Sequence, residues 1–233
     1  MKIFVGIDDT DNPGSRGTGR LARGIAAELG KTCDLYGVTR HQLLVHPDIP
    51  YTSHNSSAVI HLDGCKASDV SRIFRTAKKL MLADFIEGSD PGLAVATEEQ
   101  TMPGVAAFGM DAKRIIVTMA RAEELAHNVG IVYEGLGGTC GGIIGAIAGI
   151  GLASTGSDGR FLMKAHSRDL KYHVRTLPEV LASGIDQVAT IDGRPVNGGR
   201  IDLGRSANPS YVHGKAVLFV EERDGYLVAL KRD

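Results

Sequence analysis

The chain has 233 residues, 43% of them hydrophobic and 23% charged, and its 26 Lys and Arg residues nearly balance its 27 Asp and Glu residues. This length and composition are typical of a globular protein with one large domain, alone or with a small appendage. The net charge of -1 excludes a general positive field for holding nucleic acid, and no apolar run reaches the roughly 18 residues that a membrane span needs. Because residues 2–7 also lack the pattern of a signal peptide, we expect a cytoplasmic protein without a membrane partner.

The first half of the chain predicts alternating strands and helices. Residues 2–7 form a short apolar strand, and apolar residues at helical spacing between Leu21 and Leu29 predict a helix that Gly30 ends. Thr18 stands where the N-cap of that helix is expected. Further along, two neighbouring strands, an amphipathic helix and a short apolar run are predicted at residues 38–46, 57–62, 68–85 and 93–96.

The second half of the chain predicts a buried helix and then a strand-rich region. Residues 114–119 fit a strand or part of a helix, because so short an apolar run does not decide between them. Residues 131–136 lead into a glycine loop and an apolar helix at 143–152. Short alternating runs follow at 188–191, 200–203, 215–221 and 226–230, with Asp224-Gly225 as a hairpin signal. We therefore predict an α/β (α+β) fold with a mixed sheet and helices, divided loosely into residues 1–175 and a small β-rich part, residues 176–233.

Three carboxylates follow the first predicted strand, at Asp8, Asp9 and Asp11. Such neighbours repel one another unless a positive group lies among them, and Mg2+ prefers oxygen ligands of this kind. The loop continues into Gly17-Thr18-Gly19, whose backbone N–H groups and following helix suit a phosphate. We interpret the three aspartates as metal ligands, Asp8 and residues 17–19 as nucleotide contacts, and Asp9, Asp11 and Thr18 as catalytic. A solvated Asp-rich turn is the alternative.

Two other motifs compete for the same segment. Haloacid-dehalogenase phosphatases also place an Asp-x-Asp pair after the first strand, as Asp9 and Asp11 are placed here, with the first Asp as nucleophile. Actin-like ATPases have an Asp-rich turn, but they require Gly where this chain has Thr10. Neither motif accounts for the Gly-Thr-Gly segment that follows.

A second glycine-rich segment is predicted to contact the nucleotide through Gly137, Gly138, Thr139, Gly141 and Gly142. It precedes an apolar helix that is rich in small residues, so a ligand could approach its backbone closely. The segment lacks the GxxxxGK[ST] pattern of a Walker loop. A glycine corner that serves only tight packing is the alternative.

Polar residues around a proline-rich loop form the third predicted group, His46, Asp48, Tyr51, His54 and Asn55. We interpret them as substrate contacts, with ordinary surface residues as the alternative. The cysteines, Cys33, Cys65 and Cys140, are odd in number and have no CxxC spacing, which argues against a disulfide framework and a zinc ribbon. We expect free, reduced thiols, with Cys140 as an inert residue rather than a nucleophile.

These segments together resemble the archaeal tRNA-isoleucine agmatidine synthetase family, whose members use ATP to attach agmatine to a tRNA cytidine. The resemblance is to the catalytic part of that family and rests on ordered blocks at residues 6–11, Thr18 before 21–22, residues 47–51 with Asn55 and 58–59, residues 90–92, and residues 142–151.

The resemblance implies an ATP- and Mg2+-using, kinase-like domain in which Thr18 corresponds to a threonine that accepts phosphate. The family's Cys-Thr-Thr is Gly17-Thr18-Gly19 here, which keeps the central threonine and loses both neighbours. The family continues into an OB-fold and a Cys-rich zinc ribbon that hold tRNA, and we expect neither in this chain. It is therefore expected to be a stand-alone relative of the catalytic part that binds tRNA weakly.

The sequence thus predicts an ATP-dependent, kinase- or ligase-like enzyme that transfers phosphate to a small-molecule or RNA acceptor. Two other functions stay open. One is a nucleotide-binding module without chemistry that acts with a partner. The other is a metal-dependent phosphatase that hydrolyses a simple phosphoester without ATP.

Overall fold

A computed structural model describes residues 1–10, 17–50, 54–164, 167–170, 174–204, 207–223 and 225–231 of the chain. The chain divides into two compact units, Met1–Thr155 and Gly156–Asp233, which we describe separately. This division by packing comes earlier in the chain than the loose boundary near residue 175 that the sequence predicts. No helix in the described ranges is both long enough and apolar enough to cross a membrane.

The first unit is built on an antiparallel sheet with the strand order β5-β4-β1-β3-β2. Its strands are β1 (Ile3–Asp8), β2 (Asp34–Gln42), β3 (Ser56–Asp63), β4 (Gly92–Thr97) and β5 (Val132–Gly135). Two helices lie between them in the sequence, α1 (Thr18–Leu29) and α2 (Val70–Ala83). The chain order β1-α1-β2-β3-α2-β4 with the spatial order β4-β1-β3-β2 is the ferredoxin-like arrangement.

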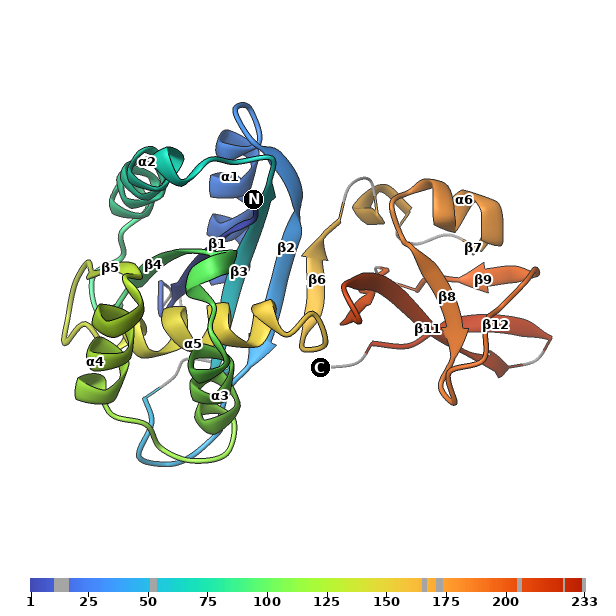
Figure 1. Cartoon of the computed structure of the whole chain (residues 1–233). Helices are drawn as coiled ribbons and strands as arrows, with labels where there is room; N and C mark the ends of the chain where they lie inside the picture. The colour runs from blue at the N-terminus through green and yellow to red at the C-terminus, as the bar shows by residue number, and fades with distance from the viewer. Residues whose placement is uncertain are drawn as a thin grey trace. The chain divides into compact units, whose positions relative to one another are not determined.

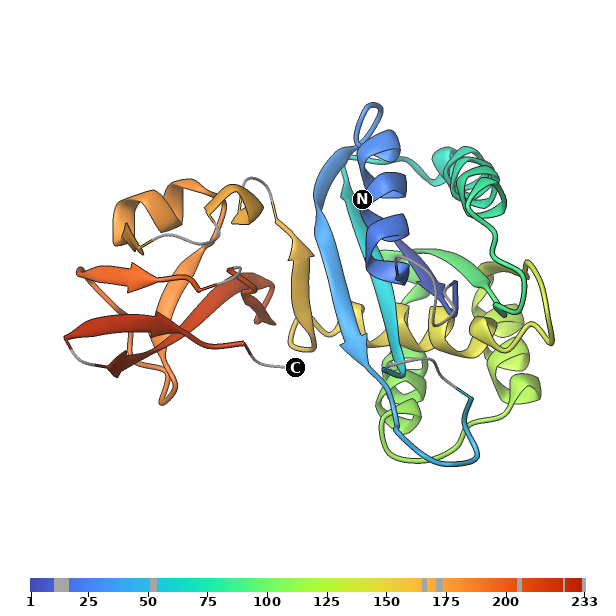
Figure 2. The ribbon, with the colours of Figure 1, turned by 180° about the vertical axis from the view of Figure 1, so that it is seen from behind.

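Helices cover both faces of this sheet. Figures 1 and 2 show α1 and α2 on one face and three further helices on the other, α3 (Pro103–Ala112), α4 (Met119–Val129) and α5 (Gly142–Ser154). Short 3-10 turns stand before α2 and after β4, at Ala67–Asp69 and Glu98–Gln100. Because both faces are covered, β1 and β4 are buried almost throughout and have continuous apolar sequences rather than alternating ones.

Helix α5 lies directly against the backbone of its neighbours. A Cβ atom at Gly6 of β1 would overlap the carbonyl oxygen of Ala146, and one at Gly92 of β4 would overlap the backbone of Gly142. On its other side, a Cβ atom at Gly151 would overlap the carbonyl of Val105 in α3. Small residues on both partners therefore allow α5 to approach the sheet and α3 more closely than side chains normally permit.

The sequence prediction for residues 114–119 is wrong, because residues 113–118 are a turn and loop between α3 and α4. The apolar run misled the prediction, since Ile115 and Ile116 are 51% and 48% exposed. Both flanking helices were missed, although α3 has Pro103 in its first turn, where proline is favoured. Helix α4 has matching end signals: the Thr118 side chain accepts a hydrogen bond from Arg121 N, and Gly130 ends the helix in a left-handed conformation.

The second unit consists mainly of short strands. They are β6 (Arg160–Met163), β7 (Val174–Thr176), β8 (Gln187–Thr190), β9 (Arg200–Asp202), β10 (Ser210–Val212), β11 (Lys215–Arg223) and β12 (Tyr226–Ala229), with a 3-10 turn at Ser167–Leu170 and the helix α6 (Leu177–Ala182). Strand β11 pairs antiparallel with β10 and β12 but parallel with β8. The predicted α/β fold with mixed pairing and a strand-rich C-terminal part is thus confirmed.

The hairpin predicted between the last two strands is present in the pairing. Arg223 of β11 stands opposite Tyr226 of β12, whereas Asp224 of the predicted turn lies outside the described residues. Buried side chains of α6 and the strands form the core of this unit, among them Val180, Ile201, Leu218 and Val220.

Glycine substitutions should separate close packing from simple helix propensity. Gly151→Ala should lower the free energy of unfolding by about 2 kcal/mol, because the new methyl group would force α5 and α3 apart. Gly24→Ala is the matched control. Gly24 lies in α1, where the added methyl group would meet nothing within 4 Å beyond its own turn of helix, and the change should raise stability by up to about 1 kcal/mol. Urea unfolding measures both values, and equal effects of the two substitutions would contradict the packing described here.

Candidate functional site

The groups predicted from the sequence emerge at one end of the first sheet. Asp8, the last residue of β1, pairs with Gly92 of β4, and Gly92 in turn pairs with Gly135 of β5. On the other side of β1, Ile7 pairs with Ala58 near the start of β3. The acidic loop after β1, the glycine loop after β5 and the loop of residues 43–55 before β3 therefore all leave the sheet at this end.

Asp8 lies against the first turns of helix α5. A Cβ atom at Gly145 would overlap the Oδ2 atom of Asp8, so this glycine makes the space that the carboxylate occupies. The start of a helix carries a partial positive charge, which favours a carboxylate at this position. The next residue, Asp9, has a φ of 49°, a left-handed conformation that aspartate and asparagine tolerate better than most residues.

Asp90 joins the acidic loop to the glycine loop. Its backbone N–H donates to the carbonyl of Asp9 over 3.1 Å, and its own carbonyl accepts from Gly142 N over 3.0 Å. Its Oδ2 accepts a hydrogen bond from Thr139 Oγ1. The other oxygen, Oδ1, is buried and has no hydrogen-bond partner among the described residues.

Sequence reasoning did not assign Asp90 to the site. In the sequence it belongs to the block 90–92 that supports the family resemblance. Its partners Asp9 and Thr139 are distant in the sequence, so no local pattern shows these contacts. One sequence feature does point to Asp90: it is an acidic residue two positions before Gly92, the glycine that begins the buried strand β4.

The glycine loop between β5 and α5 is shaped by close packing. Gly138 has a φ of 57° and faces the Asp90 carboxylate, and a Cβ atom at Gly142 would stand 2.5 Å from Asp90 O. The first backbone N–H groups of α5 bond within the protein: Gly142 to Asp90, Ile143 to Cys140 and Ile144 to Gly141. Any backbone contact of this loop with a phosphate therefore depends on residues before Gly142, such as Gly138, Thr139 and Gly141.

Thr18 is not the N-cap of α1, as the sequence predicts, but its first helical residue. Gly17 is the N-cap, with a φ of 83°, and no side chain caps the helix. The hydroxyl of Thr18 instead accepts a hydrogen bond from Thr10 Oγ1 over 3.0 Å. A hydroxyl that accepts one bond in this way still carries its own proton for donation, and Gly19 follows it as the second residue of α1.

The loop of residues 43–55 carries the predicted substrate contacts. Asn55 has a structural role, because its Nδ2 donates to Leu44 O over 2.6 Å. His46 Nδ1 accepts from the backbone N–H of Asp48 over 3.2 Å, and both side chains are well exposed. His54 is exposed as well. Tyr51 of this group, like Asp11 of the acidic loop, lies outside the described residues.

Comparison with known proteins identifies one related enzyme. No protein-family description matches the chain. A curated relative, the 2-agmatinylcytidine synthetase TiaS of Pyrococcus horikoshii, which acts on an isoleucine tRNA, is 32% identical over 160 residues, which are 65% of this chain and 36% of the relative. The predicted relation to the catalytic part of tRNA agmatidine synthetase is thereby confirmed. The chain spans about a third of the relative's length.

Solved structures of TiaS share the fold of this segment. The complex of TiaS with its isoleucine tRNA and ATP superposes with a TM-score of 0.57 at 21% identity, covering 65% of this chain and 36% of that one. Apo TiaS gives 0.56 at 20% identity, covering 65% of this chain and 35% of that one.

The contact of Asp8 with Gly145 predicts energetic coupling between the two positions. Gly145→Ala alone should destabilise the protein, because the methyl group displaces the Asp8 carboxylate. In an Asp8→Ala background the same change should cost less, with a coupling energy of about 1 kcal/mol or more in a double-mutant cycle. Urea unfolding of the four proteins gives this value. Strictly additive effects would show that the carboxylate does not lie over the helix.

Proposed function

We propose that the first unit is an ATP- and Mg2+-using, phosphotransferase-like catalytic domain. Its phosphate site would lie between the loop of Asp8 to Thr18 and the loop of Gly137 to Gly142. The observation that carries the proposal is the bridge made by Asp90, whose backbone and side chain contact both loops. The relation to TiaS supports ATP as the nucleotide, since TiaS is described in complex with ATP and with AMPCPP.

The residues present fit a magnesium–nucleotide complex better than a metal held by protein alone. Within the described ranges no cluster of three or more acidic, His or Cys side chains is arranged for a metal ion. Mg2+ usually keeps several waters and binds through one or two carboxylates together with substrate phosphates. Asp8, Asp9 and Asp11 are the proposed ligands. The buried Oδ1 of Asp90, which has no hydrogen-bond partner among the described residues, adds an oxygen in the adjoining loop. Such an ion would neutralise charge on the phosphates.

The chain's own groups would then position the phosphate and the acceptor. Phosphoryl transfer depends mainly on positioning and charge stabilisation. The Thr18 hydroxyl would donate a hydrogen bond to a phosphate oxygen, while the hydrogen bond from Thr10 holds that hydroxyl in place. Asp9 and Asp11 would act in catalysis, and Gly17, Gly19, Gly138, Thr139 and Gly141 would allow the backbone to approach the nucleotide.

The acceptor would be a small molecule or an RNA. TiaS is described with an isoleucine tRNA and agmatine, and His46, Asp48, Tyr51, His54 and Asn55 are the proposed contacts for the acceptor in this chain. With a net charge of -1 and no general positive field, tRNA binding by this chain would be weak and strongly dependent on salt.

A nucleotide-binding module without chemistry is the second candidate. It is favoured by Gly17 and Gly19, which replace the neighbours of the family's threonine. Such a module would bind ATP without consuming it. A phosphatase of the dehalogenase type would instead hydrolyse a simple phosphoester in the absence of ATP.

Substitution of Asp9 tests the metal–phosphate site. Asp9→Asn keeps the left-handed backbone, because asparagine also tolerates this conformation, but removes the charge. Mg2+-dependent ATP binding should weaken at least about tenfold, a loss of ~1.4 kcal/mol. The melting temperature should stay near or above that of the wild type because like-charge repulsion is relieved.

Isothermal titration calorimetry measures the effect of Asp9→Asn. Asp192→Asn, at an exposed carboxylate of the second unit, is the matched control and should bind ATP as the wild type does. Equal ATP affinity of Asp9→Asn and wild type would count against the site.

Thr18 should act through its hydroxyl and not through helix capping. Thr18→Ser should keep most ATP turnover, whereas Thr18→Ala should lose most of it. Because Thr18 does not cap α1 but accepts a hydrogen bond from Thr10, the alanine variant should lose the ~1 kcal/mol typical of one hydrogen bond and stay folded. Turnover and thermal unfolding are measured on the same samples. Full turnover by the alanine variant at a temperature where it is folded would exclude a phosphate contact, and no turnover by the wild type would favour the binding module.

A further inference from the structure

Two of the three cysteines approach each other far from the proposed phosphate site. Cys33 directly precedes β2 and Cys65 follows β3, and these strands pair antiparallel with Asp34 opposite Asp63. The same register continued by one residue brings Cys33 opposite Gly64, the neighbour of Cys65. The two cysteines therefore stand at the same end of the β2–β3 pair, Cys33 one residue before the first paired residue of β2 and Cys65 two residues after the last paired residue of β3.

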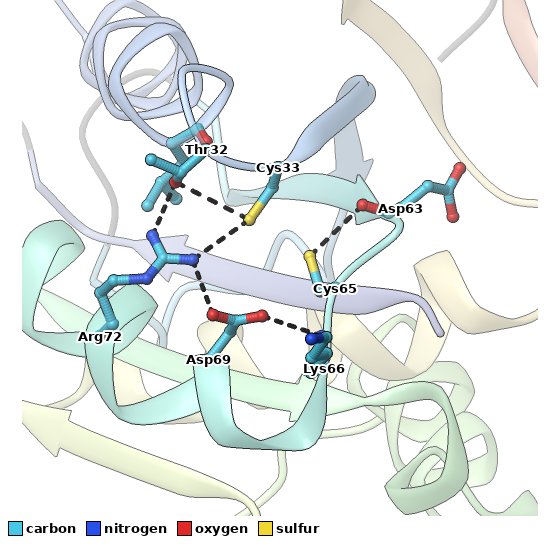
Figure 3. A network of polar contacts seen from close by, with 8 residues as sticks. Thr32, Cys33, Asp63, Cys65, Lys66, Asp69 and Arg72 are labelled. Atoms are coloured by element: carbon cyan, nitrogen blue, oxygen red, sulfur yellow. Dashed lines mark hydrogen bonds and ion pairs between the residues drawn. The ribbon is translucent and has the colours of Figure 1, made fainter.

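The two sulfur atoms also face each other. In Figure 3 both point into the space between the end of α1 and the start of α2. The Cys33 side chain is close enough to contribute to the raised pKa of Cys65. The geometry therefore suits a bond between these two sulfur atoms.

A firmly held arginine stands beside the more exposed thiol. Arg72 Nη2 donates to Cys33 Sγ over 3.6 Å and to Asp69 Oδ1 over 2.9 Å, and Nη1 donates to Thr32 Oγ1 over 2.6 Å (Figure 3). The hydrogen bond to Asp69, followed by the one to Cys33, raises the pKa of Arg72, so the guanidinium stays charged. A cation beside a partly exposed sulfur is the setting in which cysteines react with oxidants.

The second thiol has the opposite environment. Cys65 is 5% exposed, and its Sγ donates to the carbonyl of Asp63 over 3.4 Å. Burial, and after it the interaction with Cys33, raises the pKa of Cys65 to about 12. The pair therefore combines a half-buried sulfur beside a cation with a buried, protonated one.

We propose that Cys33 and Cys65 form an oxidant-sensitive thiol pair, in which a peroxide oxidises Cys33 and Cys65 then closes a disulfide. In the first step the Cys33 thiolate attacks one oxygen of hydrogen peroxide and the O–O bond breaks. Cys33 becomes a sulfenic acid, and the hydroxide released takes a proton to become water. In the second step the Cys65 sulfur attacks the Cys33 sulfur, and hydroxide leaves with the Cys65 proton as water. The thiol pair loses two electrons and the peroxide gains them.

The order of the two steps follows from the surroundings. Cys33 is the more accessible sulfur, so the peroxide reaches it first, whereas Cys65 is buried and stays protonated until it attacks. Closure would connect the segment between α1 and β2 to the segment between β3 and α2. The helices α1 and α2 cover the same face of the sheet (Figure 2). Arg72 would lose its thiol contact and keep Asp69 as a partner.

Peroxide titration of the whole protein tests the proposal. The chain is treated with hydrogen peroxide, remaining thiols are alkylated, and peptides are mapped by mass spectrometry. The expected product is a Cys33–Cys65 bridge within one chain, with Cys140 still alkylated and the bridge reversible by dithiothreitol. Three results would overturn the proposal. They are a bridge between two chains, irreversible oxidation of Cys33 without a bridge, and three intact thiols in a sample whose added glutathione is fully oxidised.

Variants separate the roles of the three groups. Cys65→Ser should leave a sulfenic acid at Cys33 that dimedone labels, whereas Cys140→Ser, the matched control, should bridge as the wild type does. Arg72→Met should slow oxidation of Cys33 several-fold, and Arg72→Lys should retain part of the rate. Circular dichroism confirms that each variant is folded. The assigned roles would be contradicted if dimedone labels Cys140 but not Cys33 in the Cys65→Ser variant. They would also be contradicted if Cys33 of the Arg72→Met variant is oxidised at the wild-type rate.

Discussion

Close approach of helix α5 to the sheet is the constraint on which the first unit depends. The approach is backbone against backbone, at Gly6 with Ala146 and at Gly92 with Gly142. A side chain at Gly6 or Gly92 would overlap backbone atoms of α5 and force the two layers apart. Because the helix begins beside Gly92, the same contact fixes where the glycine loop ends and where the carboxylate of Asp8 lies.

The candidate site is a consequence of this packing. Gly145 leaves room for Asp8, Gly142 donates to the carbonyl of Asp90, and Thr139 donates to the Asp90 side chain. The glycines of the loop therefore satisfy a packing requirement and shape the proposed phosphate site at once. Packing and function, which the sequence presents as alternatives for this loop, are compatible in the structure.

Elements with a clear period were predicted well from the sequence. The helices α1 and α2 and the strands β1, β3 and β4 have continuous apolar runs or amphipathic patterns, and their local preferences agree with their tertiary surroundings. Strand β2 begins and ends four residues earlier than the predicted range 38–46, because the apolar residues 43–45 continue the strand pattern past its end. Helix α3 was missed because its short sequence mixes glycine and alanine with few large apolar residues, and Ile115 and Ile116 carry an apolar pattern into an exposed loop. The position of Thr18 was wrong by one residue because Gly17, with its positive φ, takes the cap position.

Contacts between distant parts of the chain were not predictable in this way. Asp8 and Asp9 could be proposed from their local pattern, but the role of Asp90 depends on Asp9 and Thr139, which only the folded sheet brings together. The same holds for Cys33 and Cys65, which have no motif spacing and meet because β2 pairs with β3. Local sequence thus indicated the chemistry of single segments, and the strand register decided which segments share a site.

A crystal structure of the chain with Mg2+ and a non-hydrolysable ATP analogue would test the central claim most directly. We expect the triphosphate between the loop of Asp8 to Thr18 and the loop of Gly137 to Gly142, with the metal on the aspartates and Thr18 Oγ1 directed at a phosphate oxygen. A nucleotide bound elsewhere on the chain, or a triphosphate at this end of the sheet that contacts neither loop, would contradict the account.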